Sequence, residues 1–248
     1  MIILLSPAKT LDFKRRISSS QHSEATFSGK ADSIARMMQS YSRADLMQVM
    51  KMSEKLADLS YERFRDWDSG DVEQIQAGAA FKGEAYNGLD MTSLDEDSLD
   101  FAQEHLRILS GMYGILRPYD IIKPYRLEMG SKLREESLYT IWKETLTESI
   151  NKDLEKSGTP LINLSSSEYF KALDLKNIKG DTITPLFKEK KNGAFKTIVV
   201  YTKKARGMMA RYIIENRLEQ AEDLKKFNKD GYAYNEELSE GNTWMFTR

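Results

Sequence analysis

The chain has 248 residues, 40% hydrophobic and 30% charged, a composition that excludes both a disordered chain and a membrane protein. It has no cysteine, which excludes disulfides, thiolate metal sites and thiol redox chemistry, and two histidines are too few for a histidine-rich metal site. The longest purely apolar run, Ile2–Leu5, is far shorter than the roughly 20 residues that span a bilayer. We therefore expect a cytoplasmic globular protein with no metal, no cofactor and no membrane contact.

The charges sum to −1 but are unevenly distributed along the chain. Residues 84–104 carry seven acidic and no basic side chains, whereas residues 170–229 carry fifteen lysines and arginines against seven acids. Such a basic segment indicates an anionic partner, and solvated surface lysines are the alternative explanation.

In chain order, a short strand comes first and helices follow. Ile2–Leu5, ended by a Ser-Pro pair, has the pattern of a buried strand. Apolar residues then recur every three or four positions, which predicts three helices within about 28–68 and single helices at 72–81 and 94–106. The acidic Ser93-Leu-Asp-Glu-Asp segment suits the start of the last helix, because acids there complement the helix dipole.

Strands and helices alternate in the second half of the chain. Residues 110–120 contain two glycines and a proline, which predicts strand and loop rather than helix. Asn192-Gly193 is a strong hairpin signal and predicts a turn between strands at 182–187 and 195–201. The remaining elements expected here are helices at 139–154 and 205–218 and strands at 160–164, 232–234 and 244–246.

The pattern as a whole predicts one folded unit. The sequence contains no internal repeat, no low-complexity tract and no linker rich in proline or glycine. We therefore predict the α+β class, with a single compact mixed domain over residues 1–248 and a helical insertion at about 28–90.

Three cations, Lys203, Lys204 and Arg206, fall at the expected start of the helix at 205–218. A cation at a helix N-terminus opposes the helix dipole by roughly 0.3–1 kcal/mol, so stability alone does not explain three of them. An anion bound by backbone amides and these side chains would explain them, and the segment therefore predicts a phosphate site. The alternative is a surface turn whose lysines extend into solvent.

Two further polar segments directly follow expected strands, where open α/β sheets often bind ligands. Ser6, Lys9 and Thr10 come after the first strand, and Lys9 is available to an anion. Ser166 and Glu168 come after the strand at 160–164. Hydroxyl groups and free amides there suit a phosphate, but serine followed by glutamate is also an ordinary capping box, which is the simpler interpretation.

Residues 109–130 form the densest aromatic and basic cluster. Arg117, Tyr125 and Arg126 suit stacking on bases or binding of phosphates, and Glu128 suits an arginine pair or acid–base chemistry. A core segment with one internal ion pair explains the same residues.

Lys51, Ser53 and Lys55 lie between two expected helices, with the spacing of a helix–hairpin–helix. In DNA-binding hairpins the turn presents backbone amides to a phosphate, with basic side chains nearby. The turn here has no glycine, and simple packing between two helices is the alternative.

Five segments together resemble the YaaA family of bacterial peroxide stress proteins, in the same order and along the whole chain. These segments are Ser6-Pro-Ala-Lys-Thr-Leu-Asp-Phe, Phe81-Lys-Gly-Glu-Ala-Tyr-Asn-Gly-Leu, residues 109–130, Asn163-Leu-Ser-Ser-Ser-Glu-Tyr-Phe-Lys and Lys203-Lys-Ala-Arg-Gly. The resemblance implies a cytoplasmic α+β protein that limits intracellular free iron during hydrogen peroxide stress. It also implies DNA binding through a basic cleft and a helix–hairpin–helix-like element.

Matched onto this chain, the resemblance places the hairpin at about 50–59. The cleft it implies draws on Lys9, Lys82, Arg117, Arg126, Lys203, Lys204 and Arg206. A chain without cysteine and with two histidines is poorly suited to reduce peroxide or to hold iron tightly, so we expect its effect on iron to be indirect.

Two functional hypotheses follow, and whether the protein is an enzyme stays open between them. The first is a stress protein that contacts the phosphates of double-stranded or structured DNA. The second is an enzyme acting on a nucleotide or other phosphorylated small molecule, with Glu128, Glu168 or Tyr125 as catalytic candidates. A scaffold without a ligand is a third reading. Both leading hypotheses predict one concavity bordered by residues from distant segments, namely Lys9, Arg126, Ser166 and Lys203.

Overall fold

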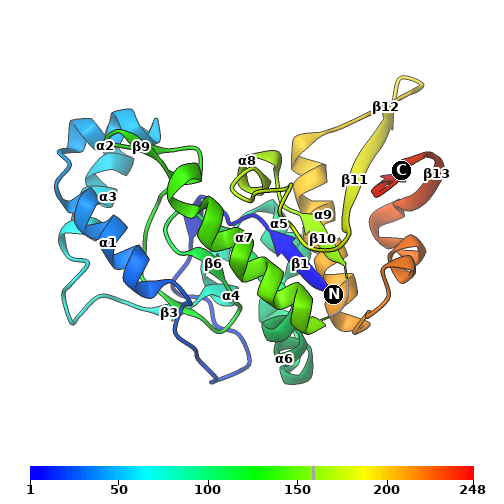
Figure 1. Cartoon of the computed structure of the whole chain (residues 1–248), viewed down its shortest axis with the longest axis horizontal. Helices are drawn as coiled ribbons and strands as arrows, with labels where there is room; N and C mark the ends of the chain where they lie inside the picture. The colour runs from blue at the N-terminus through cyan, green and yellow to red at the C-terminus, as the bar shows by residue number, and fades with distance from the viewer. Residues whose placement is uncertain (158–159) are drawn as a thin grey trace.

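The computed structural model describes residues 1–157 and 160–248. Its centre is a mixed β-sheet with the strand order β13-β14-β11-β10-β1-β5-β6, and β12 pairs with β11 (Figure 1). The strands of this sheet are β1 (Ile2–Leu5), β5 (Leu106–Ser110), β6 (Gly114–Leu116), β10 (Leu161–Leu164), β11 (Thr182–Lys191), β12 (Ala194–Lys196), β13 (Ala233–Glu240) and β14 (Thr243–Thr247). The predicted α+β class is confirmed.

The interior of the sheet is parallel. β1 pairs in parallel with both β5 and β10, β10 with β11, and β11 with β14, whereas β6, β12 and β13 pair antiparallel. Leu5 of β1 lies opposite Leu164 of β10, so the loops that follow these two strands leave the sheet side by side. The fold thereby brings together two segments that are far apart in the sequence.

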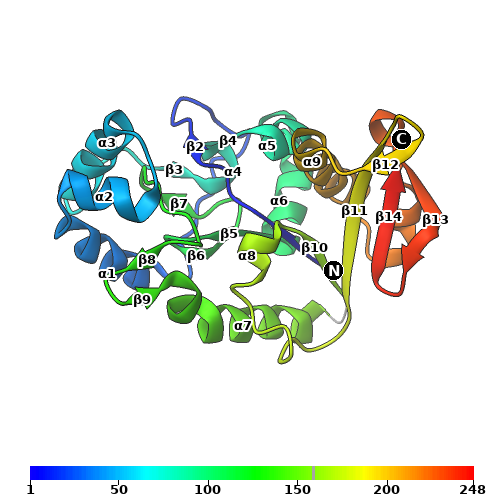
Figure 2. The same ribbon diagram turned by 90° about the horizontal axis from the view of Figure 1, so that it is seen from above.

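Helices cover both faces of the sheet. In Figure 2, α7 lies along one face, α5, α6 and α9 lie on the other, and α1 to α3 cluster at one end of the molecule. The helices are α1 (Ser28–Gln39), α2 (Arg43–Met50), α3 (Glu54–Arg65), α4 (Ala77–Ala80), α5 (Glu84–Leu89), α6 (Glu96–His105), α7 (Leu138–Ser157), α8 (Ser167–Phe170) and α9 (Val199–Glu215). None of the helices in the described ranges has the length and apolarity needed to cross a membrane.

Short elements complete the chain. The described ranges also contain three 3-10 helices, η1 (Met91–Ser93), η2 (Ala221–Lys226) and η3 (Lys229–Gly231). Three two-stranded pairings lie outside the main sheet: β2 (Thr10–Leu11) with β4 (Phe81–Lys82), β3 (Ile75–Gln76) with β7 (Ile121–Ile122), and β8 (Lys132–Leu133) with β9 (Glu136–Ser137).

The structure confirms several elements that were predicted from local sequence patterns. The three helices expected within 28–68 are α1, α2 and α3, and the strand expected at the N-terminus is β1, whose residues are all buried. The expected cap of α6 is made by Asp95, whose carboxylate accepts a hydrogen bond from the Ser98 amide at 2.8 Å. Asn192 and Gly193 both have positive φ, 54° and 78°, as the tight turn between β11 and β12 requires.

Two predictions of local structure were wrong. Within residues 72–81 only Ala77–Ala80 is helical, because Ile75 and Gln76 pair with β7 and Phe81 pairs with β2. The strand expected at 195–201 ends at Lys196, and α9 begins at Val199 instead of 205. The β-branched residues at 198–200 favoured a strand, but packing of α9 against α5 and the sheet overrides that preference.

Two glycines set the distance between α5 and α9. A Cβ atom at Gly207 would lie 1.7 Å from the Ala85 carbonyl oxygen, and one at Gly88 would lie 2.2 Å from the Lys204 carbonyl oxygen. No side chain fits at either position, so the two backbones approach more closely than ordinary helices do. This contact holds the basic residues of α9 against the segment around α5.

The pair α2 and α3 is joined by a three-residue turn in which Lys51 adopts a left-handed conformation with φ of 46°. The structure thus has two adjacent helices with a short turn where a helix–hairpin–helix was expected. Nothing in the structure identifies this turn as a DNA-binding hairpin. Both views place it at one end of the molecule, away from α9 (Figures 1 and 2).

Candidate anion-binding site

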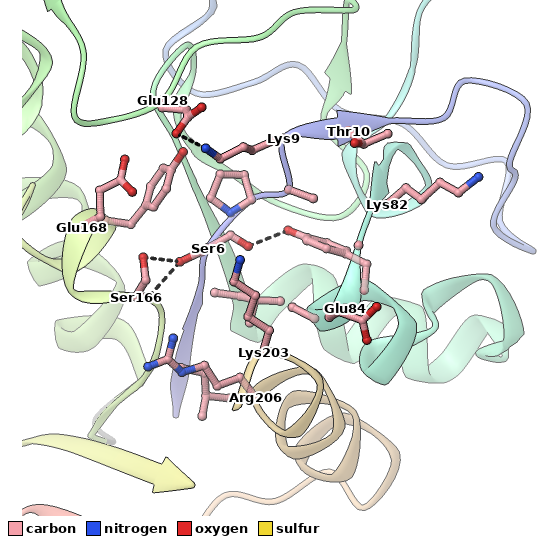
Figure 3. A pocket seen from close by; sticks show the side chains of 18 residues that line it. Ser6, Lys9, Thr10, Lys82, Glu84, Glu128, Ser166, Glu168, Lys203 and Arg206 are labelled. Atoms are coloured by element: carbon pink, nitrogen blue, oxygen red, sulfur yellow. Dashed lines mark hydrogen bonds and ion pairs between the residues drawn. The ribbon is translucent and has the colours of Figure 1, made fainter. Parts of the chain in front are cut away.

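A pocket of about 410 Å³ opens at the carboxyl ends of β1 and β10. Its walls come from the loop after β1, the segment leading into α5, the start of α8 and the side of α9, as Figure 3 shows. The lining residues are Leu5, Ser6, Pro7, Ala8, Lys9, Thr10, Lys82, Gly83, Glu84, Ala85, Tyr86, Glu128, Leu164, Ser166, Glu168, Tyr169, Lys203 and Arg206. Five separate parts of the sequence, among them the one that carries Glu128, therefore meet at one edge of the sheet.

Ser6 and Ser166 form the floor of this pocket. The Ser166 amide donates to Ser6 Oγ at 2.8 Å, and Ser6 Oγ donates to Ser166 Oγ at 3.3 Å. Ser166 stands at the N-cap position of α8, yet its side chain makes no capping hydrogen bond. The capping box favoured by the sequence is therefore wrong, and the hydroxyl of Ser166 retains the capacity to donate to a ligand.

Lys203 and Arg206 enter the pocket from α9. They are the fifth and eighth residues of this helix, so they do not lie in its first turn, and the expected conflict with the helix dipole is wrong. Neither side chain forms an ion pair with a carboxylate of the described residues. Figure 3 shows Lys203 extending toward Ser6 and the Arg206 guanidinium on the side of Ser166.

Arg206 is the buried cation of the site. Its Nε is removed from solvent and has no hydrogen-bond partner among the described residues. Burial lowers the pKa of this guanidinium, and no neighbouring carboxylate offsets that effect. A buried donor without a partner is unfavourable, and an anion in the pocket would pair with the same guanidinium.

A carboxylate holds the cations on the opposite side of the pocket. Glu128 lies 2.6 Å from Lys9 Nζ through one oxygen and 3.6 Å from an Arg126 nitrogen through the other. Glu168 accepts a hydrogen bond from the Gly130 amide at 3.2 Å. The cations near Glu128 are thus compensated, whereas Lys203 and Arg206 are not.

The predicted site residues separate into three groups. The structure gathers Ser6, Lys9, Thr10, Lys82, Glu128, Ser166, Glu168, Lys203 and Arg206 in the pocket, and Tyr125 and Arg126 line a small hollow that shares Lys9 and Glu128 with it. Arg117, Lys204, Lys51, Ser53 and Lys55 lie outside both. Of the four residues expected around one concavity, Lys9, Ser166 and Lys203 line the pocket, and Arg126 lines only the adjoining hollow.

The outlying residues have other partners. Arg117 pairs with the fully buried Asp120 at 3.2 Å, and Lys204 lies 3.6 Å from Asp230. Tyr125 shares a hydrogen bond of 2.7 Å with Ser110, and burial raises the pKa of its phenol, so it is a core residue and an unsuitable base. These contacts agree with the internal ion pair and aromatic core that were the alternative for residues 109–130.

Sequence reasoning missed the two tyrosines of the pocket. Tyr86 donates a hydrogen bond to the Ser6 carbonyl oxygen at 3.0 Å, and this contact fixes the loop after β1 against α5. Tyr169 contributes a ring to the opposite wall, and burial raises the pKa of its phenol. Both tyrosines lie within segments that carry the family resemblance, so the resemblance could have pointed to them.

Within the described ranges no three His, Cys, Asp or Glu side chains are placed to hold a metal ion.

The fold and the pocket together define a protein with a mixed, mainly parallel sheet and a partly uncompensated cationic site at the carboxyl edge of its strands. The family model described as "Peroxide stress protein YaaA" matches residues 1–238. The chain belongs to this family.

Curated relatives match over the full length. A UPF0246 protein of Hahella chejuensis is 42% identical over 254 residues, covering 100% of this chain and 99% of that protein. A UPF0246 protein of Alteromonas mediterranea is 45% identical over 254 residues, covering 100% of this chain and 98% of that protein.

Proposed function

We propose that the protein serves the peroxide stress response by binding DNA, with a phosphate group of the nucleic acid held in the pocket. The observation that carries the proposal is the unpaired Arg206 guanidinium, which lies beside the Ser6 and Ser166 hydroxyls and Lys203. A guanidinium binds two phosphate oxygens at once, and the Ser166 hydroxyl can donate to another, so a phosphate supplies the partner that Arg206 lacks and an acceptor for Ser166.

We further propose that the protein limits free iron and oxidative damage indirectly, through DNA. The chain has no cysteine and two histidines, so it lacks the soft ligands that hold iron tightly. Cationic contact with DNA is chemistry that its residues can perform.

Salt dependence tests the DNA contact. For phosphate binding, log affinity should fall linearly with log salt, with a slope of about −0.9 for each phosphate neutralised and little dependence on sequence. Lys203→Ala should make the slope shallower by about one unit, because it removes one phosphate contact. The matched control is Lys204→Ala, the next residue of α9, which lies outside the pocket and pairs with Asp230. Equal slopes for the two variants would contradict DNA binding at this pocket.

A second candidate is an enzyme that acts on a nucleotide or other phosphorylated small molecule. The observation in its favour is that Glu128 and Glu168 line the same pocket as the unpaired cations. A carboxylate beside a phosphate site can accept or donate a proton, whereas a protein that only contacts the DNA backbone has no use for one.

Glu128→Gln separates the two candidates. If the pocket only binds, removal of this charge frees Lys9 and Arg126 for the ligand and raises DNA affinity at low salt. The expected gain is roughly two- to fivefold, because an exposed ion pair is worth about 0–1 kcal/mol. The control is Glu84→Gln, which removes a pocket carboxylate that holds no cation in the described chain. An enzyme that uses Glu128 would lose turnover of a phosphorylated substrate in the same variant.

A further inference from the structure

The uncompensated guanidinium of Arg206 is more buried than the paired lysines of the pocket. Ser6 directly follows β1, Ser166 lies two residues after β10, and both are half-buried, whereas the Nε atom of Arg206 is removed from solvent. The side chains of Lys9 and Lys82 are 60% and 57% exposed and are held by Glu128 and Asp12. A phosphate that pairs with Arg206 and with the Ser166 hydroxyl therefore lies further inside the pocket than the exposed ends of Lys9 and Lys82.

A deep position limits the chemistry of that phosphate. An internal phosphodiester of DNA is linked to a nucleotide on each side. Both parts of the strand would therefore have to leave the pocket through its one opening. The pocket volume of about 410 Å³ is at the lower end of the range for a single small ligand, and it does not accommodate two chains side by side. A phosphate monoester continues on one side only and fits this geometry.

The rest of the lining suits the nucleoside that follows such a phosphate. The lining also includes the apolar side chains of Pro7, Ala8 and Ala85 and the aromatic side chain of Tyr169. Bases released from a stack bind to apolar and aromatic surfaces of this kind. Lys9 and Lys82 at the rim are placed to meet the next phosphates of a strand.

We infer that the pocket binds a terminal phosphate monoester together with its attached nucleoside, carried either by a free mononucleotide or by the end of a DNA strand. The inference rests on the proposed binding of phosphate in this pocket and specifies which phosphate it is. It predicts recognition of DNA ends and not of the uninterrupted backbone.

The test compares ligands that differ only in the terminal phosphate. Fluorescence anisotropy is measured with one single-stranded oligonucleotide carrying a 5′-phosphate, a 3′-phosphate or only hydroxyl ends. Unlabelled dAMP, deoxyadenosine, inorganic phosphate and closed circular DNA are the competitors. At least one phosphorylated end should bind about tenfold or more tightly than hydroxyl ends, the effect typical of one charge-assisted hydrogen bond. This preference should weaken as the pH falls through about 6, where a monoester loses its second charge.

Two variants test whether the preference for phosphorylated ends depends on the pocket. Arg206→Met should abolish this preference, and Lys204→Met should retain it. Competition by dAMP but not by deoxyadenosine or inorganic phosphate supports the nucleotide class, and binding of dAMP without binding of any oligonucleotide identifies free nucleotides as the source. In that last case the proposed DNA function fails and the inference stands.

Other outcomes overturn the inference. Equal affinity for phosphorylated and hydroxyl ends, with closed circular DNA competing equally well, shows that internal phosphates are bound. If Lys203→Ala then still weakens the salt dependence, the proposed DNA function stands and only the specificity for a monoester is wrong. Inorganic phosphate that binds as tightly as dAMP removes the nucleoside from the site.

Discussion

Gly207→Ala should lower the melting temperature substantially, although alanine is normally the better residue inside a helix. The new Cβ would lie 1.7 Å from the Ala85 carbonyl oxygen and 2.8 Å from the Leu89 amide nitrogen, and neither backbone atom can rotate away. Overpacking of this kind typically destabilises a protein by about 1–3 kcal/mol, and a clash with backbone belongs at the upper end. For a chain of this size about 3 kcal/mol corresponds to a fall in Tm of about 6–12 °C.

The same substitution should also weaken ligand binding. Lys203 and Arg206 reach the pocket from the turn of α9 that packs on α5 at Gly207, so displacing α9 moves both cations away from Ser6 and Ser166. A displacement of about 1 Å in a binding group is enough to lose most of its contribution. Calorimetry for Tm and anisotropy for DNA affinity measure the two effects on one sample.

Gly29→Ala is the matched control for Gly207→Ala. Gly29 lies in α1, and a Cβ atom there would have no neighbour within 4 Å. Alanine at such a site should stabilise the protein by about 0.4–1 kcal/mol, because the unfolded chain loses conformational freedom. If Gly207→Ala melts like Gly29→Ala, the close approach of α5 and α9 does not hold the site together.

How far the sequence predicts this structure depends on the range of the interactions involved. The Asn192-Gly193 turn and the Asp95 cap were predictable because each depends on a few adjacent residues. The start of α9 at Val199 was not, because β-branched residues there favour a strand, and the packing of the helix as a whole against α5 and the sheet overrides that preference. Knowledge of Gly88 and Gly207 as a pair would have been needed to foresee that packing.

In the candidate site, too, some features could be predicted from local sequence and others depend on contacts between distant segments. Placing Lys9 and Ser166 near the carboxyl ends of strands followed from the general behaviour of open sheets. The hydrogen bond between Ser6 and Ser166 spans 160 residues and depends on β1 lying next to β10, which no local pattern reveals. Lys203 and Lys204 are adjacent, yet only Lys203 lines the pocket, because successive residues of a helix point about 100° apart. That distinction requires knowing which face of α9 is buried.

Arg206→Met should raise stability and remove ligand binding in the same variant. Arg206 carries a charge whose Nε is buried without a hydrogen-bond partner in the described chain, and burial without compensation lowers the pKa of the group. An unsatisfied buried donor destabilises a protein by about 1–3 kcal/mol. Methionine keeps the length of the apolar stem and omits the charged group, so Tm should rise by several degrees, at about 2–4 °C for each kcal/mol.

Binding of a phosphate should change in the opposite direction. The guanidinium is the one charged group at the floor of the pocket that no described carboxylate compensates, and a hydrogen bond between charged partners is worth about 1.5–3 kcal/mol. Its loss should reduce affinity for phosphorylated DNA by about ten- to a hundredfold. Functional sites often lower the stability of the unliganded protein, because they hold groups whose hydrogen-bond partners are supplied only by the ligand.

Lys204→Met completes the comparison, because it removes a cation from the same helix outside the pocket. Lys204 is partly exposed and 3.6 Å from Asp230, so its replacement should change stability by no more than about 0.5 kcal/mol and leave phosphate affinity unchanged. Should Arg206→Met instead melt well below the unaltered protein, the guanidinium stabilises the contact between α9 and the sheet. Its assignment to a ligand would then be wrong. If Arg206→Met raises Tm but leaves phosphate affinity unchanged, the buried Arg206 charge does not bind the phosphate. The anion would then have to bind through the lysines at the rim.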